Sequence, residues 1–365
     1  MVALGACQTP APPPSQPAVS GTPLRLTPTL PPPPSAAELA QRAALRELVA
    51  YQDRLYRVAA PLLLDNAPLC KRHARNLLGF TAKNKYSYSS EFVESAQKVL
   101  GLGDQLQIVG IMAGSGAAAA GIRSGDKLLA VEGWTLPQGQ DAEHEAGLTL
   151  LSALVKKTAI NLKISRARSD LTVNVPLTQA CAFVVELGNT DDVAAYADGH
   201  RIMLTRGMLD FTPSDDELGI LLATEMAHNV LGDVARQHMS AAVAAAIDNF
   251  TRIHPEADKS RDDIKPIPLE ANIAADRLGL YMAVRAGYNP GRAGPFWSRL
   301  AERYPASQAG SYTAYHPLGP SRLSAIDKTL AEIKGKQRDG KPLTPTGVVP
   351  TGAPQPGAPS SVMPR

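Results

Sequence analysis

Residues 214–233 read SDDELGILLATEMAHNVLGD, and this stretch decides how most of the chain is interpreted. Ser214 followed by Glu217 has the spacing of a capping box, which predicts that a long helix begins here. Within that helix Glu225 and His228 lie three positions apart and therefore share one face. Taken alone, this pair does not distinguish a functional site from an ordinary amphipathic helix.

Zinc proteases carry H-E-x-x-H on such a helix, where the two histidines coordinate zinc and the glutamate polarises the bound water. Here the same frame reads T-E-M-A-H, so Thr224 stands where the first histidine would be. The spacing of the motif is therefore kept, but one of its metal ligands is replaced.

The flanking sequence carries further motifs in a fixed order. They are YADG at 196–199, IMLTRGM at 202–208, ADRLGLY at 275–281, RAGYNP at 285–290, Phe296-Trp297, and His316-Pro317 with Arg322. Together with the helix, this series resembles the HtpX/CAAX-prenyl-protease family of HExxH zinc metallopeptidases (the minigluzincin type). The resemblance spans roughly residues 180–335.

The resemblance implies a general base at Glu225 and a zinc ligand at His228. It places the other two ligands at Thr224 and Asn272, whose neutral hydroxyl and amide are poor zinc ligands. A structural zinc site yields roughly 10–16 kcal/mol from four ligands, so losing two weakens binding by about four orders of magnitude. The sequence therefore predicts no conventional peptidase activity and no bound cofactor.

An alternative ligand set stays open. The resemblance implies that His316 reaches toward the metal from a loop and that Asp276 supports the site. His228, His316 and Asp276 would then form a rewired site with zinc as its cofactor.

A second resemblance lies earlier in the chain, where residues 114–133 read GSGAAAAGIRSGDKLLAVEG. A short small-residue helix, a Gly-Asp turn and an apolar strand in this order resemble a PDZ domain over about residues 91–178, with residues 140–156 as its groove helix. A PDZ groove binds an extended peptide as an added strand and holds its terminal carboxylate with backbone N–H groups. The glycine-containing segment formed by Leu100, Gly101, Leu102 and Gly103 is the candidate carboxylate loop.

The three cysteines suggest two different roles. Cys7 ends the run Leu-Gly-Ala-Cys, which resembles a bacterial lipobox and predicts lipidation of this residue. Only six residues precede Cys7, fewer than a signal peptide needs, so the alternative is an ordinary cysteine in a disordered tail. In an oxidising compartment Cys70 and Cys181 are the natural disulfide pair, and two buried free thiols are the alternative.

Composition limits the class of protein. Apolar residues make up 44% of the chain, enough for a sizeable core, and the net charge is only +3. No basic stripe with interleaved aromatic residues is present, which disfavours nucleic-acid binding. No apolar run approaches the 18 or so residues of a membrane-spanning helix. Eighteen of the 31 prolines lie in residues 1–35 and 341–365, so we expect the packed part to be about 36–340.

We therefore expect an α+β fold in which a mostly helical metallopeptidase-like domain with a small sheet receives an inserted PDZ-like β-rich domain. A capping box at Ser35 predicts a first helix, which Pro61 should end. The expected segments are a lipoprotein signal remnant and Pro-rich tether (1–34), an N-terminal helical segment of the peptidase-like domain (35–90), the PDZ-like domain (91–178), the metallopeptidase-like domain (179–336) and a disordered tail (337–365).

The function that this organisation favours is that of an inactive metallopeptidase acting as a peptide- or protein-binding module. It would bind peptides or envelope proteins through the PDZ groove and the former substrate cleft. The lipid anchor would hold it at a membrane of the bacterial periplasm, with the outer membrane preferred, in a role such as protein quality control. Two alternatives stay open: an active zinc metalloendopeptidase with a non-standard metal site, and a structural envelope lipoprotein whose groove is blocked.

Overall fold

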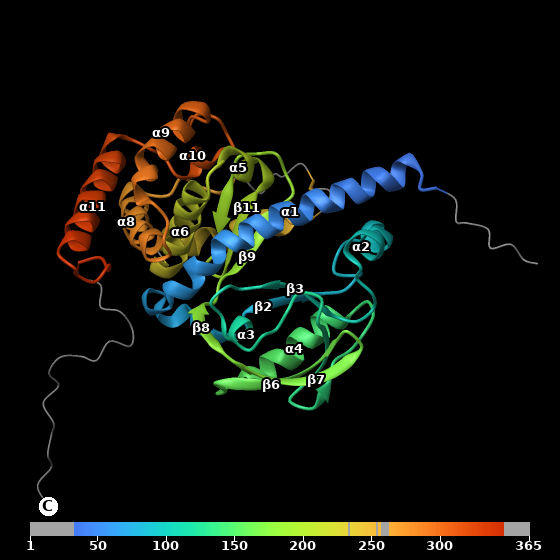
Figure 1. The fold of residues 1–365 in the computed structure, drawn as a ribbon. Helices are drawn as coiled ribbons and strands as arrows, with labels where there is room; N and C mark the ends of the chain where they lie inside the picture. The colour runs from blue at the N-terminus through green and yellow to red at the C-terminus, as the bar shows by residue number, and fades with distance from the viewer. Residues whose placement is uncertain (1–32, 233, 253–254, 257–262, 347–365) are drawn as a thin grey trace, which may run out of the picture.

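A computed structural model describes residues 33–346 except 233, 253–254 and 257–262. The described chain forms a helical unit and a β-rich unit, and the first helix extends along both (Figure 1). The predicted α+β class is confirmed. Cys7, the Pro-rich tether and most of the C-terminal tail lie outside the described residues.

The first helix, α1 (Ala36–Asp65), begins as predicted with a capping box between Ser35 and Glu38. The prediction that Pro61 ends it is wrong, because the helix continues through Pro61 to Asp65. Leu62 and Leu63 follow the proline and are buried in the core of the helical unit. Their burial outweighs the loss of one backbone hydrogen bond at the proline.

The β-rich unit is built on a six-stranded antiparallel sheet in the order β2-β3-β4-β6-β7, with β5 paired to β4. Its strands are β2 (Phe80–Lys83), β3 (Gln107–Ile111), β4 (Lys127–Val131), β5 (Trp134–Thr135), β6 (Ala159–Arg166) and β7 (Ser169–Pro176). Its helices are η3 (Ser90–Phe92), α2 (Val93–Leu100), α3 (Gly116–Ala119) and α4 (Ala142–Leu154). The sheet thus begins at Phe80, before the boundary predicted at residue 91. The prediction missed β2 because η3 and α2 lie between this strand and its partner β3 in the sequence.

The two chain segments that join the units lie side by side. β1 (Ala74–Leu77) leads into the β-rich unit and pairs antiparallel with β8 (Thr178–Cys181), which leads out of it. Just before β1 come two short turns, η1 (Ala67–Leu69) and η2 (Lys71–His73). A disulfide joins Cys70 to Cys181, with their Cα atoms 5.6 Å apart. The connection is therefore both hydrogen-bonded and covalent.

The helical unit surrounds a three-stranded sheet in the order β10-β11-β9, in which β11 runs parallel to β9 and antiparallel to β10. The strands are β9 (Val184–Gly188), β10 (Ala195–Ala197) and β11 (Arg201–Thr205). The helices are α5 (Arg206–Phe211), α6 (Asp215–Leu231), α7 (Val234–Phe250), α8 (Leu269–Arg285), η5 (Pro290–Arg292), α9 (Ala293–Arg303), α10 (Tyr312–Tyr315) and α11 (Pro320–Arg338).

Helices α6 and α8 pack closely at the centre of the helical unit. The backbone of Gly279 on α8 lies against Thr224 on α6, where an added Cβ would come within 2.9 Å of the Thr224 Cα. A glycine is therefore needed for the two helices to approach this closely. The contact positions the sequence motif of α6 deep in the core.

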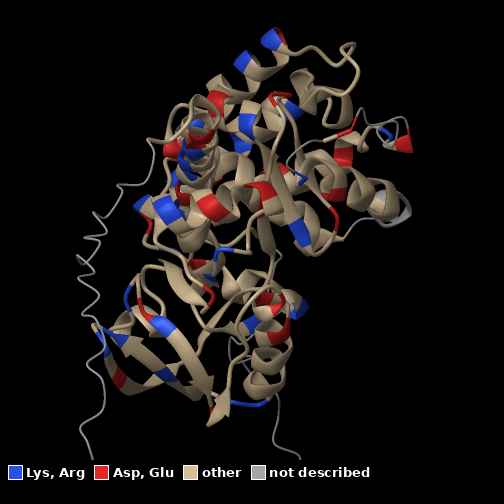
Figure 2. Ribbon diagram, turned by 90° about the vertical axis from the view of Figure 1, so that its right-hand side faces the viewer, with Lys and Arg blue, Asp and Glu red and all other residues tan. Residues whose placement is uncertain are grey.

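Acidic and basic residues are interspersed over both units (Figure 2). Among the described residues, none of the helices combines the length and the apolar character required to cross a bilayer.

Candidate metal centre and peptide groove

The central helix α6 carries Glu225 and His228 into the core. Ser214 caps its start by accepting a hydrogen bond from the Glu217 N–H, and Gly232 ends it in a left-handed conformation with φ 57°. The side chains of Glu225 and His228 are 0% and 1% exposed. These two polar groups therefore depend on partners within the protein, since water does not reach them.

His316, at the end of α10, meets these two residues. Its Nε2 lies 3.6 Å from Glu225 Oε1, and its ring centroid lies 5.1 Å from that of His228. One possible ligand atom from each of Glu225, His228 and His316 lies within 4.8 Å of the other two. The structure thus brings a carboxylate and two imidazoles together from positions almost ninety residues apart in the sequence.

Tyr312, which was not among the site residues predicted from the sequence, belongs to the same cluster. Its hydroxyl donates to Glu225 Oε1 at 3.0 Å, and its ring stacks on His316 with centroids 4.2 Å apart. Burial raises the pKa of Tyr312 well above its ordinary value, so its hydroxyl stays protonated and available as a donor. Its position one helical turn before His316 is the sequence signal that points to it.

Asn272 and Thr224 occupy the positions at which the family resemblance placed two zinc ligands. Asn272 Oδ1 lies 3.1 Å from His316 Nδ1, and its Nδ2 donates to the Ile267 carbonyl at 3.0 Å. Thr224 is 1% exposed and lies at the contact with Gly279. A neutral amide engaged in three hydrogen bonds does not fit the family's zinc triad, and neither does the neutral hydroxyl of a threonine whose backbone packs against Gly279.

Asp276 does not join the group of possible metal ligands, which corrects the rewired set proposed from the sequence. Its carboxylate accepts two hydrogen bonds from Arg322, at 2.6 and 3.0 Å. Burial opposes the charge of Arg322, but Asp276 outweighs this effect and the pKa of Arg322 is raised. Arg322 also donates to the His316 carbonyl at 2.8 Å. The pair therefore acts as a clamp that holds the His316 segment in place.

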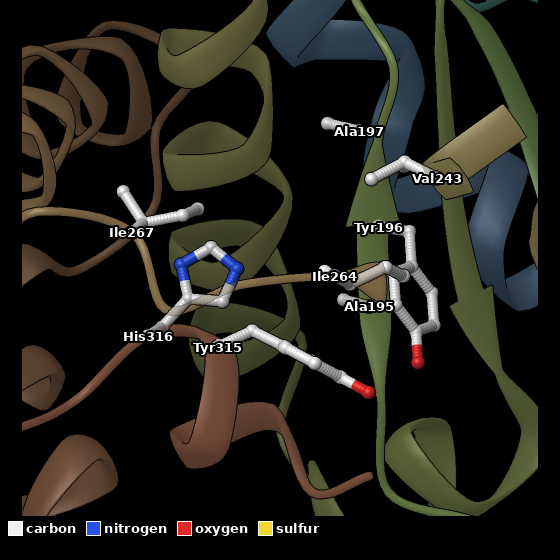
Figure 3. Close-up of a pocket in the computed structure, with 8 residues that line it drawn as sticks. All are labelled: Ala195, Tyr196, Ala197, Val243, Ile264, Ile267, Tyr315 and His316. Carbon is white, nitrogen blue, oxygen red and sulfur yellow. The ribbon is translucent and has the colours of Figure 1, made fainter. Parts of the chain in front are cut away.

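A small cavity of about 20 Å³ lies beside His316, next to the edge strand β10. Figure 3 shows its lining: Ala195, Tyr196, Ala197, Val243, Ile264, Ile267, Tyr315 and His316. This volume is enough for about one water molecule. The cavity is bordered by apolar side chains from α7 and from residues 264–267.

The segment Leu100–Gly103 is not placed as a carboxylate loop, which corrects a second sequence prediction. Leu100 and Gly101 end α2, and Leu102 is buried in a small cluster with Leu45, Phe92 and Ala96. The Gly103 carbonyl accepts from the Lys85 N–H, beyond the carboxyl end of β2. This segment therefore fixes α2 against α1.

One of the two edge strands of the sheet is β2, and Gly79 with φ 82° introduces that strand. Leu78 and Phe80 pack against the same hydrophobic cluster as Leu150 and Leu154 of α4. The edge strand and the helix therefore border one core and form a candidate peptide groove. A glycine between two apolar residues directly before a short strand was the available sequence signal.

Helix α4 also presents an apolar stripe to solvent. Leu148, Leu151 and Val155 are 57%, 66% and 65% exposed. A Cβ added at Gly147 would meet nothing within 4 Å, so space is open on this helix. Exposed apolar side chains that follow one helix are a typical feature of a binding surface.

Comparison with known proteins gives one family match. Residues 146–261 match the model of peptidase family M48, a range that includes Glu225 and His228 and ends before Asn272 and His316. The metallopeptidase-like character predicted from the sequence is confirmed to this extent. No curated protein matches the chain.

Among solved structures, similar chains come from PDZ-containing proteins. One is the HtrA3 PDZ domain bound to a phage-derived ligand, at 16% identity and a TM-score of 0.22, covering 29% of this chain and 88% of that one. A second is the HtrA-type protease AlgW S227A with a decapeptide, at 19% identity and a TM-score of 0.21, covering 29% of each chain. A third is a PDZ domain protein from Parabacteroides distasonis, at 19% identity and a TM-score of 0.20, covering 29% of this chain and 20% of that one.

Proposed function

We propose that this protein is a metallopeptidase-like protein that binds peptides without hydrolysing them. The observation that carries the proposal is the state of Glu225. This residue occupies the general-base position, yet it is fully buried and accepts a hydrogen bond from Tyr312. The small cavity nearby is lined by its neighbour His316, and it has room for about one water. A general base must reach the proton that it abstracts in a bound substrate.

The replaced ligands support the same conclusion. Hydrolysis by this family requires zinc-bound water next to the glutamate, and zinc at that place requires ligands at 224 and 272. Thr224 and Asn272 do not supply them, and Asn272 is occupied by His316 and by the Ile267 carbonyl. We therefore assign no hydrolytic step to these residues.

Peptide binding is supported by the β-rich unit. The edge strand β2 offers backbone N–H and C=O groups on one side, and α4 offers the exposed side chains of Leu148, Leu151 and Val155 on the other. An extended peptide can add to such an edge as a further strand, and its alternate side chains then contact the helix. Partner peptides or envelope proteins with an apolar C-terminus are the class that fits.

The compartment belongs to the same proposal. The disulfide between Cys70 and Cys181 is of the kind that persists in oxidising compartments such as the bacterial periplasm. The lipobox-like sequence at Cys7 supports attachment to a membrane there, preferably the outer membrane, through a lipid. A protein that combines a lipid anchor with a peptide-binding groove would suit a role in envelope protein quality control.

The absence of hydrolysis is tested with labelled, unfolded casein and the full purified chain, with and without added zinc. We expect no more cleavage than with Glu225→Gln. Cleavage by the wild type that is lost in Glu225→Gln and kept in His144→Ala would overturn the proposal and favour an active zinc endopeptidase. His144 is a suitable control because its side chain is exposed on α4, within the other unit.

Peptide binding is tested by fluorescence anisotropy with a library of peptides that end in apolar residues with a free carboxylate. We expect saturable binding that weakens by about tenfold or more in Leu151→Glu, which corresponds to about 1.4 kcal/mol. Trp134→Ala, which removes another exposed large side chain of the same unit, is the matched control and should bind as the wild type. No saturable binding across the library would favour the structural envelope protein.

A further inference from the structure

Three buried side chains form a donor set that differs from the family's zinc triad. Glu225 and His228 come from α6 and His316 from the end of α10, and each is at most 2% exposed. Their ligand atoms lie within 4.8 Å of one another. Two imidazoles and one carboxylate are a combination that suits zinc.

Asn272 determines which nitrogen of His316 faces the other two residues. Because its Nδ2 donates to the Ile267 carbonyl, its Oδ1 is the atom directed at His316 Nδ1. An amide oxygen only accepts hydrogen bonds, so Nδ1 must carry the proton of that bond. In the neutral ring the lone pair then lies on Nε2, the nitrogen that faces Glu225.

This arrangement is the one that metal-binding histidines usually have, with the second ring nitrogen donating to an oxygen that fixes the ring. Tyr312 supplies a corresponding contact on the other side, because its hydroxyl donates to Glu225 Oε1. Both side chains that face the centre are thus oriented by a buried neighbour. Asn272 stands at the family's third ligand position, and here it orients His316, which takes over as a ligand.

The separation of the donors also fits a metal better than a direct hydrogen bond. Glu225 Oε1 and His316 Nε2 lie 3.6 Å apart, beyond the usual range for N–H···O bonds of about 2.7–3.2 Å. Bonds of about 2.1 Å to a tetrahedral zinc place two ligand atoms about 3.4 Å apart.

We propose that Glu225, His228 and His316 bind one zinc ion and that Asn272 positions His316 for this role. In this arrangement Glu225 is a ligand and is no longer available as a general base. The ion therefore stabilises the contact between α6 and the His316 segment without restoring hydrolysis. The proposal is independent of peptide binding, and a zinc-loaded protein that leaves casein intact satisfies both.

The experiment uses the full chain, stripped with a chelator and titrated with zinc by calorimetry. We expect one equivalent of zinc and a raised melting temperature. His228→Ala and His316→Ala should each weaken binding by about 100-fold or more, and Asn272→Ala by about 10–100-fold, the usual effect of losing a group that orients a ligand. His144→Ala, the exposed control, should bind as the wild type.

A measurement on the wild type alone keeps the proposal testable if a core variant fails to fold. X-ray absorption at the zinc edge counts the imidazoles on the ion, and we expect two. A count below two, binding that His316→Ala leaves unchanged, or no stoichiometric binding at all would overturn the proposal.

Discussion

The hydroxyl of Tyr312 lies 3.0 Å from Oε1 of Glu225, and neither side chain is exposed to solvent. A carboxylate in the core is stable only when buried donors replace its water shell. Tyr312 therefore stabilises the most deeply buried acidic group of the site, and it also packs its ring against His316.

Removing this hydroxyl by Tyr312→Phe should lower the free energy of unfolding by about 1–3 kcal/mol, because a buried acceptor loses its donor. Urea denaturation followed by circular dichroism measures the change. Tyr51→Phe makes the same substitution at a hydroxyl that donates to the Asp210 carboxylate near the surface, and it should cost less. Equal losses in the two variants would show that burial of Glu225 adds nothing to the bond.

The Asp276–Arg322 clamp should be far more sensitive than the ion pairs at the surface. The two side chains are 2% and 0% exposed, so Arg322→Ala leaves a buried carboxylate without its counter-ion and should cost about 3–5 kcal/mol. Arg252→Ala breaks an exposed pair with Glu256 and should cost about 1 kcal/mol or less. Thermal unfolding of the two variants side by side makes the comparison, and a similar loss in both would contradict the clamp.

The contact between α6 and α8 predicts opposite results for two glycine substitutions. Gly279→Ala places a Cβ 2.9 Å from the Thr224 Cα and should destabilise the protein by about 1–3 kcal/mol through overpacking. Gly335→Ala, within α11, meets nothing within 4 Å and should stabilise the helix by about 0.5–1 kcal/mol. Melting temperatures that move in the same direction would exclude this explanation.

Stability at low pH should depend on Glu332 in α11. Partial burial raises the pKa of this carboxyl, but hydrogen bonds from Thr346, Tyr281, Arg277 and Lys336 outweigh it and lower the pKa to about 2 from its ordinary 4.5. The folded state therefore favours the ionised form. The resulting stability is complete above about pH 4.5 and is lost as the pH falls toward 2.

Glu332→Gln should consequently reduce stability by about 2 kcal/mol at pH 7, an amount that allows for solvent screening. The difference between the variant and the wild type should disappear near pH 2. Urea titrations across this range measure both. A constant difference at every pH would show that the effect of Glu332 is not electrostatic.

The sequence predicted the parts of the fold that depend on local signals. The capping box at Ser35 and the Ser214 cap begin helices where expected, and the Gly-Asp turn at 125–126 precedes strand β4. The Glu217 carboxylate does not complete a capping box with Ser214, because it pairs with Arg299. Where packing between distant segments decides the outcome, the prediction failed. Leu62 and Leu63 extend α1 past its proline, and β2 joins the sheet across an intervening helix.

The same distinction between local signals and contacts between distant segments applies to the candidate site. Glu225 and His228 could be identified from their spacing on one helix. The role of Asn272 could not, because it depends on a contact with His316, 44 positions later. The family resemblance suggested Asp276 as a ligand in an alternative metal site. Its pairing with Arg322 could not be predicted, because Arg322 lies on a different helix and no spacing rule connects the two.

The disulfide between Cys70 and Cys181 has a topological consequence. It closes the chain from 70 to 181 into a covalent ring, and the whole β-rich unit lies within that ring. A protease that cuts an exposed loop of this unit once would open the ring without releasing a fragment. The nicked molecule would run as one species on a non-reducing gel and as two after reduction. Damage to the peptide groove would therefore leave the helical unit still joined to any N-terminal anchor.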